Sequence, residues 1–297
     1  MERFFSKILS KNKFLSIFEL GRPWNGLASS LAALIGILLA SEHFPSFSTL
    51  LLPFIAFFCC FLGGTVLNDI FGIKIDKLNM PFRPLQSKRV SYKEALIFMI
   101  GMYIIGIGVS LFLTFKFSIV VAIFAIGSIL YSLPPIALEK RSFLAQLSLS
   151  IISFFIPAYG GVILVTNRFI IPVNLLILFI SFTLLYSFAV VIKDFKDIKG
   201  DKIGGKKTFV LDVGEKSAKF VMITGTLIMF PITIFILNTI FKNWLFIILS
   251  FLSLIMTLYY EFNVEKNPEG AFQNVRLAIS YFLFIILLFS ITNVLKL

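Results

Sequence analysis

Residues 68–91 read NDIFGIKIDKLNMPFRPLQSKRVS, and the rest of the chain is organised around this stretch. It lies between two long apolar runs. On a helix, Asn68, Gly72 and Asp76 would follow one another at one-turn intervals and share a face. Carboxylates beside hydrocarbon are costly unless something cationic lies between them. The stretch therefore predicts a cation site or, in a plainer interpretation, an interfacial loop whose charges lie in water.

The composition is that of a membrane protein. Of 297 residues, 58% are hydrophobic and 14% are charged. The net charge is +12, but the basic residues lie in short connections between apolar runs, where they act as topology signals. We therefore expect no nucleic-acid partner. The adjacent Cys59 and Cys60 exclude a disulfide framework, and the single histidine, His43, has no Cys or His neighbour that would indicate zinc.

Nine apolar runs are each long enough, at about 20 residues, to span a bilayer. They predict an all-α protein with about nine transmembrane helices in one domain, residues 1–297, that begins with a short segment, residues 1–22. Nothing in that segment resembles a cleavable signal. The runs cover residues 24–41, 48–71, 95–115, 117–137, 143–165, 169–192, 219–241, 244–261 and 277–295.

Along the whole chain, connections dense in Lys and Arg alternate with connections in which these residues are sparse. The first segment is dense, with Arg3, Lys7, Lys11, Lys13 and Arg22, and the connection 41–46 has no Lys or Arg. By the positive-inside rule, the N-terminus and every dense connection are cytoplasmic. We therefore expect a multi-pass protein of the cell membrane with its acidic stretches on the cytoplasmic side.

A second acidic stretch, residues 186–209, reads YSFAVVIKDFKDIKGDKIGGKKTF. Asp194, Asp197 and Asp201 stand at i, i+3 and i+7, so a helix places them on one stripe. Carboxylates so placed repel one another unless a cation neutralises them. Magnesium prefers oxygen ligands and takes one or two carboxylates together with phosphate oxygens. Two such stretches with Lys and Arg nearby predict a magnesium–diphosphate clamp, and in a membrane they favour a polyprenyl diphosphate.

Together the two stretches resemble the signatures of the UbiA superfamily of intramembrane prenyltransferases. The first signature, NDxxDxxxD followed by NxxxRP, is matched by Asn68, Asp69, Asp76, Asn79, Arg83 and Pro84. The second, KDxxDxxGD followed by Gly and Thr or Ser, is matched by Lys193, Asp194, Asp197, Gly200, Asp201, Gly204 and Thr208. Two shorter elements also match, Arg22-Pro23-x-Asn25 and Tyr131-Ser132-x-Pro134-Pro135.

The resemblance implies helices around a central cavity, a cytoplasmic-side active site and two magnesium ions. The metal ligands that it implies are Asn68, Asp69, Asp76, Asp194, Asp197 and Asp201. The catalytic set is Asn68, Asp76, Asp194, Asp201 and Lys193, and the substrate-binding set is Arg22, Asn25, Asn79, Arg83, Tyr131, Lys140 and Arg141. Arg22, Arg83 and Lys140 also fit a role as positive-inside anchors.

One position departs from the first signature, since Gly72 stands where the central Asp is usual. Asp69 points about 100° around the helix from Asn68 and so is a poor substitute. Three consequences stay open: a metal held by Asn68, Asp76 and water, a lower metal affinity, or lost activity.

The resemblance implies magnesium-dependent transfer of a polyprenyl group, most simply geranylgeranyl, from its diphosphate to a lipophilic acceptor. The pattern is most like digeranylgeranylglyceryl phosphate synthases, whose acceptor is geranylgeranylglyceryl phosphate in ether-lipid synthesis. Ala189, where those enzymes often carry Glu, weakens this choice. An aromatic or tetrapyrrole acceptor (homogentisate, 4-hydroxybenzoate or chlorophyllide) stays open.

A protein of another class, a non-catalytic lipid-binding or transport protein, is the further alternative. Transporter acids usually lie near the membrane midplane, whereas these cluster at predicted helix ends. The expected partners are the donor, the acceptor and membrane lipid, with no obligate protein partner.

Overall fold

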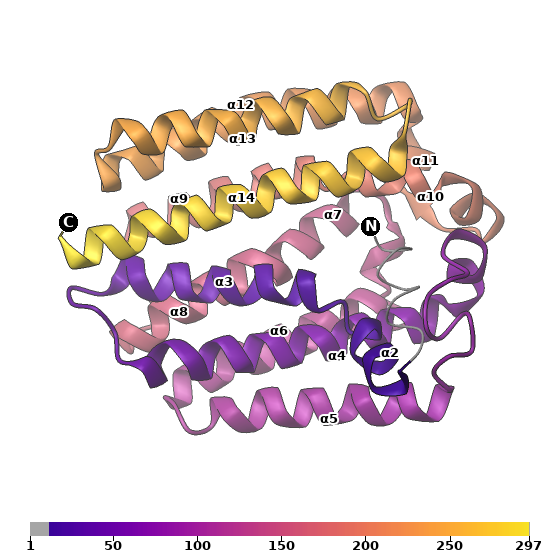
Figure 1. Ribbon diagram of the computed structural model, residues 1–297, viewed down its shortest axis with the longest axis horizontal. Helices are drawn as coiled ribbons and strands as arrows, with labels where there is room; N and C mark the ends of the chain where they lie inside the picture. Colours follow the sequence, from indigo (N-terminus) through magenta and orange to yellow (C-terminus); the bar gives the residue numbers. More distant parts are fainter. Residues whose placement is uncertain (1–11, 297) are drawn as a thin grey trace.

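The computed structural model describes residues 12–296 and shows a bundle of long helices (Figure 1). Arg3, Lys7 and Lys11, which the charge analysis counted, lie outside the described residues. The helices are α2 (Lys13–Leu20), α3 (Pro23–Ala40), α4 (Phe47–Asn79), α5 (Tyr92–Ser110), α6 (Phe115–Ser132), α7 (Ser142–Ser150), α8 (Ile156–Thr166), α9 (Val173–Ala189), α10 (Ile192–Ile203), α11 (Phe209–Val213), α12 (Glu215–Phe241), α13 (Trp244–Phe262) and α14 (Pro268–Leu295). Short elements complete the chain: η1 (Leu138–Lys140), η2 (Ile151–Phe155) and β1 (Lys207–Thr208).

The number of apolar spans agrees with the sequence prediction. Among the described residues, eight helices are long and apolar enough to cross a membrane, counting Ser142–Thr166 as one. A ninth arises if α9 and α10, bent by 47° at a short break, form one span. The protein is thus an integral multi-pass membrane protein, while the assignment of its cytoplasmic side stays a prediction.

Helix α4 is longer than the predicted run 48–71, and this decides where the first acidic stretch lies. The helix continues to Asn79, and Pro81 follows its C-cap residue, Met80. A proline disfavours helical geometry in the residue before it, which explains this stop. Asp69 and Asp76 therefore lie on a helix rather than in the interfacial loop of the plainer interpretation.

Two prolines that fall within the predicted apolar runs lie at the starts of helices. Pro172 falls within the run 169–192, but it occupies the N-cap of α9. Pro157 lies at the start of α8, directly after the π-helical turn η2. Because proline removes a backbone donor, the helix that contains it must adjust its hydrogen bonding, and a π-turn is one such adjustment.

Helices α3 and α8 cross closely because both carry glycine at the contact. A Cβ atom on Gly36 would collide with the backbone of Ala158, and one on Gly161 would collide with the backbone of Ala33. Small residues allow such close approach between helices in membranes. This contact fixes α3, whose first turn reaches the site described below.

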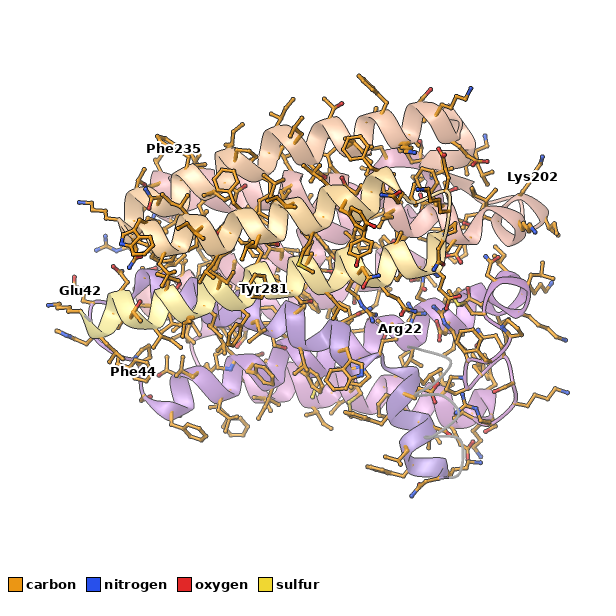
Figure 2. The ribbon with its side chains drawn as sticks, turned by 45° about the horizontal axis from the view of Figure 1, so that its top comes forward. Arg22, Glu42, Phe44, Lys202, Phe235 and Tyr281 are labelled. Carbon is orange, nitrogen blue, oxygen red and sulfur yellow. The ribbon has the colours of Figure 1, made fainter. Side chains whose placement is uncertain are left out.

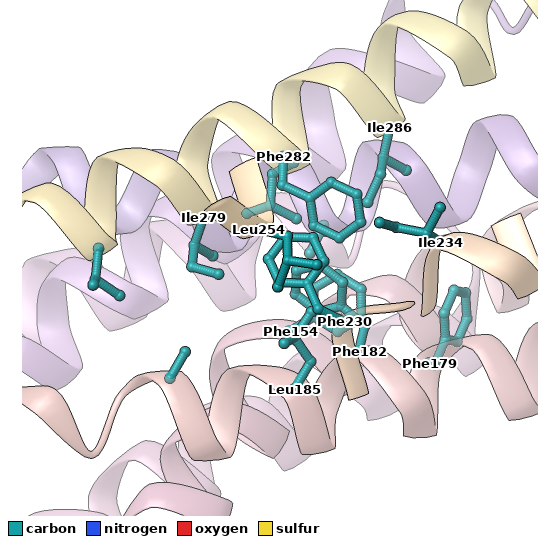
Figure 3. Packing of buried hydrophobic residues seen from close by; sticks show 14 of the residues in the cluster. Phe154, Phe179, Phe182, Leu185, Phe230, Ile234, Leu254, Ile279, Phe282 and Ile286 are labelled. Atoms are coloured by element: carbon teal, nitrogen blue, oxygen red, sulfur yellow. The ribbon is translucent and has the colours of Figure 1, made fainter. Parts of the chain in front are cut away.

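The largest hydrophobic cluster is rich in phenylalanine (Figure 3). Phe154 and Phe182 stack with ring centroids 3.9 Å apart, and Phe282 joins them at 5.9 Å from Phe182. The ring centroids of Phe230 and Phe282 lie 4.6 Å apart. Aromatic pairs of this kind add stabilisation beyond buried area. The cluster connects η2 and α9 with α12 and α14.

The two acidic stretches meet at one end of the bundle. Figure 1 shows α10 and the last turns of α4 together at the end of the molecule opposite the C-terminus. Figure 2 likewise places Lys202 of α10 and Glu42 of the sparse 41–46 connection at opposite ends. A short parallel pairing of Arg141 with Lys207 and of Ser142 with Thr208 ties the loop before α7 to the segment after α10.

Candidate active site

Asn79 joins the two acidic stretches directly. Its side-chain Nδ2 donates to Asp201 Oδ1 at 3.2 Å, and its Oδ1 accepts from the backbone N–H of Gly200 at 3.0 Å. Gly200 is required at this contact, because a Cβ there would collide with the Asn79 amide. The last residue of α4 therefore holds α10 at a fixed position.

The carboxylates of α4 are paired with arginines. Asp69 is fully buried and forms ion pairs with Arg22 and with Arg83, the latter at 3.2 Å. Arg83 also contacts Asp76 Oδ2 at 2.9 Å. Arg22 is the N-cap residue of α3 and has a left-handed backbone (φ 51°), which an L-residue adopts only at some cost. The pairing with buried Asp69 offsets that cost.

Asn68 turns toward a carboxylate that the sequence reasoning did not single out. Its Nδ2 donates to Glu139 Oε2 at 2.7 Å and to Ser132 Oγ at 3.1 Å. Glu139 is buried and also pairs with Lys206 at 3.3 Å. Burial by itself lowers the pKa of Lys206, but Glu139 together with Tyr131 and Asp201 outweighs burial, and the pKa is raised. Lys206 therefore stays cationic.

The second stretch carries its own network. Lys193 Nζ lies 3.3 Å from the Tyr131 hydroxyl and 3.7 Å from Asp194 Oδ1. Asp194 is buried and accepts from Gln146 Nε2 at 2.6 Å. Asp197 pairs with its neighbour Lys196 at 3.1 Å. A lysine therefore lies beside both Asp194 and Asp197.

These networks open into a cavity of about 770 Å³, a size typical of ligand-binding pockets. One part is charged, and the other is lined by apolar side chains such as Phe124, Phe154 and Phe182. The cavity therefore suits a ligand with an anionic head and an apolar tail.

The structure brings most of the expected site residues to this cavity, but not all. The lining includes Arg22, Asn25, Asn68, Asp69, Asp76, Arg83, Tyr131, Lys193 and Asp197. Asn79, Lys140, Arg141, Asp194 and Asp201 are absent from it. Arg141 is exposed and donates to the backbone carbonyls of Pro135 and Ile136. Asp194 and Asp201 lie behind the lining, where Gln146 and Asn79 bind them.

The carboxylates of the cavity suit magnesium better than a metal that needs a cage of protein ligands. Among the described residues, no three Asp, Glu, His or Cys side chains converge closely enough to hold a metal by themselves. Magnesium rarely requires such a cage, because substrate phosphates and water complete its shell around one or two carboxylates. The carboxylates of α4 and α10 thus fit an ion shared with a diphosphate. At Gly72, a Cβ would lie 3.4 Å from Asp76 Oδ2, so a side chain there would be next to this site.

Three kinds of residue escaped the sequence reasoning. Glu139 belongs to no signature, and an acid in a basic connection gives no topology signal. Gln146 had a usable signal, since an amide inside an apolar run is rare and needs a partner. The phenylalanines of the cavity gave no signal in the sequence, because 37 Phe residues are spread over the chain.

Comparisons with known proteins find relatives over most of the chain. Residues 29–291 match the model of the UbiA prenyltransferase family. A digeranylgeranylglyceryl phosphate synthase of Saccharolobus solfataricus is 28% identical over 259 residues, which are 86% of this chain and 89% of that protein.

Two solved structures have the same fold. One, described as giving insights into the biosynthesis of digeranylgeranylglyceryl phosphate synthase in membranes, is 25% identical with a TM-score of 0.63 and covers 94% of this chain and 99% of its own. The other is a UbiA homolog from Archaeoglobus fulgidus bound to GPP and Mg2+. It is 16% identical with a TM-score of 0.70, and the match covers 95% of this chain and 99% of that one.

Proposed function

The chain belongs to the UbiA prenyltransferase family, and from that premise we propose that it transfers a geranylgeranyl group from its diphosphate to geranylgeranylglyceryl phosphate with magnesium. The observation that carries the proposal is the joining of the two acidic stretches by Asn79 at the charged part of a partly apolar cavity. This arrangement offers a diphosphate its counter-ions and a prenyl chain an apolar channel.

The donor diphosphate is held by the cavity's cations. Arg22, Arg83 and Lys193 line the charged part, and their own carboxylate partners keep them oriented. Asp69, Asp76 and Asp197 line the same part, with Asn68 beside them and Asp194 and Asp201 supporting from behind. These oxygens would hold magnesium, which supplies positive charge to the leaving diphosphate when it is bound.

Transfer begins when the bond between the allylic carbon and the diphosphate oxygen breaks and the diphosphate leaves with the electron pair. The guanidinium and ammonium groups are already in place where this negative charge develops, so little reorganisation is needed. The faces of Tyr131 and Tyr186, both on the lining, can stabilise an allylic cation without attacking it. The acceptor's glycerol hydroxyl then forms the new C–O bond and gives its proton to an oxygen of the departed diphosphate.

The glycerophosphate acceptor is favoured by the charge of the cavity and by the relatives. Lys196, Lys206 and Arg276 line the cavity in addition to the three cations assigned to the donor. An acceptor that carries a phosphate needs such additional positive charge. The relatives reported above include a digeranylgeranylglyceryl phosphate synthase that spans most of this chain.

The test uses purified protein in detergent with geranylgeranyl diphosphate and magnesium. Geranylgeranylglyceryl phosphate, homogentisate and 4-hydroxybenzoate are offered in parallel, and products are identified by mass. We expect transfer to the glycerophosphate lipid and none after chelation of magnesium. Transfer only to an aromatic acceptor would refute the proposed acceptor, and bound donor without any transfer would favour a binding protein.

A further inference from the structure

The carboxamide of Asn68 differs from the neighbouring carboxylates of α4 in what it contacts. Asp69 forms ion pairs with Arg22 and Arg83, and Asp76 contacts Arg83 as well. The carbonyl oxygen of Asn68, Oδ1, accepts no hydrogen bond within the part of the chain that the structure describes. Asn68 also lines the cavity. Its Oδ1 is therefore an oxygen of α4 that no donor of the described chain already uses.

Both N–H groups of the same amide are in use. Nδ2 donates to Glu139 Oε2 at 2.7 Å and to Ser132 Oγ at 3.1 Å. A carboxylate can only accept a hydrogen bond, whereas a serine hydroxyl can accept or donate. Ser132 would thus tolerate either end of the amide. With the amide turned over, however, Oδ1 would lie against Glu139 Oε2, and the two acceptors would repel each other. Glu139 is therefore the neighbour that decides which way the amide faces.

The fold holds the Glu139 carboxylate in place. Lys206 Nζ lies 3.3 Å from the same Oε2 atom, and the Glu139 side chain is only 6% exposed. The parallel pairing of Arg141 with Lys207 lies two residues after Glu139 and one residue after Lys206. This pairing ties η1, which carries Glu139, to the segment that follows α10. Two donors from different segments, the Asn68 amide and the Lys206 ammonium, therefore meet at one carboxylate oxygen.

We propose that Glu139 is a positioning residue, which fixes the Asn68 amide with its oxygen available to the magnesium that accompanies the donor diphosphate. The assignment rests on the proposed function for the identity of that ligand. The oxygen and nitrogen of an amide lie on opposite sides of its carbon, so holding Nδ2 against Glu139 directs Oδ1 away from it. This orientation matters more here because Gly72, one turn further along α4, offers no side-chain oxygen.

The test measures how much magnesium the donor needs in order to bind, with no acceptor present. Geranylgeranyl diphosphate is titrated into protein in detergent by calorimetry at increasing magnesium concentrations. Glu139→Met removes the acceptor and keeps a side chain of similar length. We expect it to raise the magnesium concentration for half-maximal donor binding by roughly 10- to 100-fold, the usual effect of losing a group that orients a metal ligand.

Glu139→Gln separates the hydrogen bond from the charge. Glutamine loses the negative charge but keeps an oxygen at the same reach. Because the Asn68 amide and the Lys206 ammonium are both donors, they select the oxygen end of the glutamine side chain. The Asn68 amide therefore keeps its orientation, and the magnesium requirement of Glu139→Gln should stay close to that of wild type.

Glu42→Met is the matched control, since Glu42 is an exposed glutamate at the end of the bundle opposite Lys202 (Figure 2). It should need as much magnesium as wild type does. If Glu139→Met fails to fold, as judged by its melting temperature, Glu139→Asp replaces it. Aspartate keeps the charge but is one methylene too short to reach Asn68, so it should raise the magnesium requirement in the same way.

The results separate this positioning role from the proposed function. Donor binding by wild type that is independent of magnesium, an unchanged requirement in Glu139→Met, or an equal rise in Glu139→Gln would each overturn the positioning role. The last result would mean that the charge of Glu139 acts, and not its hydrogen bond. The expected contrast between the two variants, in a protein that forms no product, would uphold the positioning role and refute the proposed transfer. Product formation without that contrast would do the reverse.

Discussion

Replacing Asn79 by aspartate is the most direct test of the contact between the two acidic stretches. Asn79→Asp keeps the oxygen that accepts from the Gly200 N–H at 3.0 Å, but it replaces the donor to Asp201 with a second carboxylate oxygen. The two oxygens would face each other at the present 3.2 Å. The change therefore alters one interaction and preserves the shape of the side chain.

The size of the effect follows from that distance. Two unit charges 3.2 Å apart repel by about 5 kcal/mol at an effective dielectric constant of about 20. Asp201 is buried, but Asn79 is half-buried, so water screens part of the repulsion. We expect a loss of about 2 to 3 kcal/mol in the free energy of unfolding, after this discount for screening. For a chain of this size that corresponds to a melting temperature lower by roughly 3 to 5 °C.

The assay is thermal unfolding in detergent with and without magnesium. A divalent cation neutralises paired carboxylates, so magnesium should recover much of the loss in Asn79→Asp. Asn79→Ala loses both hydrogen bonds but adds no charge, so magnesium should not restore its melting temperature. Asn174→Asp, at an exposed position at the start of α9, is the control and should melt as wild type does. Melting of Asn79→Asp at the wild-type temperature would refute the idea that this contact holds α4 to α10.

Three further changes test other parts of the site and the fold. Asp194→Asn keeps an oxygen for the hydrogen bond from Gln146, so we expect turnover to fall by at least about 100-fold with an unchanged melting curve; retained turnover would exclude Asp194 from the machinery. Gly72→Asp places a carboxylate beside Asp76 and should lower the magnesium concentration needed for half-maximal activity, whereas an unchanged titration would mean that position 72 does not face the metal. Gly161→Val drives a side chain into the backbone of α3 and should destabilise the protein by about 3 kcal/mol or more, seen as a lower melting temperature; wild-type melting would mean that the α3–α8 crossing is loose.

The sequence by itself determined the class of fold. Runs of about 20 apolar residues have one stable state in a bilayer, which is a helix that satisfies its own backbone. The sequence also indicated the carboxylates of both stretches as candidate site residues, because their helical spacing and the UbiA signatures are local patterns. The end of α4 was placed too early, since the polar residues from Asn68 to Asn79 end the hydrophobic signal without ending the helix. The start of α14 was likewise placed too late, since the helix begins at Pro268 and the predicted run begins at residue 277.

The pairing of side chains between helices was decided by the tertiary structure alone. Nothing in the sequence indicates that Asn79 contacts Gly200 and Asp201, or that Asn68 turns toward Glu139. The convergence of Lys196 and Arg276 on Phe272 likewise joins residues 80 positions apart in the chain. Such contacts depend on how each helix is rotated and how far it is shifted along its neighbours. Those two quantities are set by packing at places such as the Gly36–Gly161 crossing, and no pattern within a single helix encodes them.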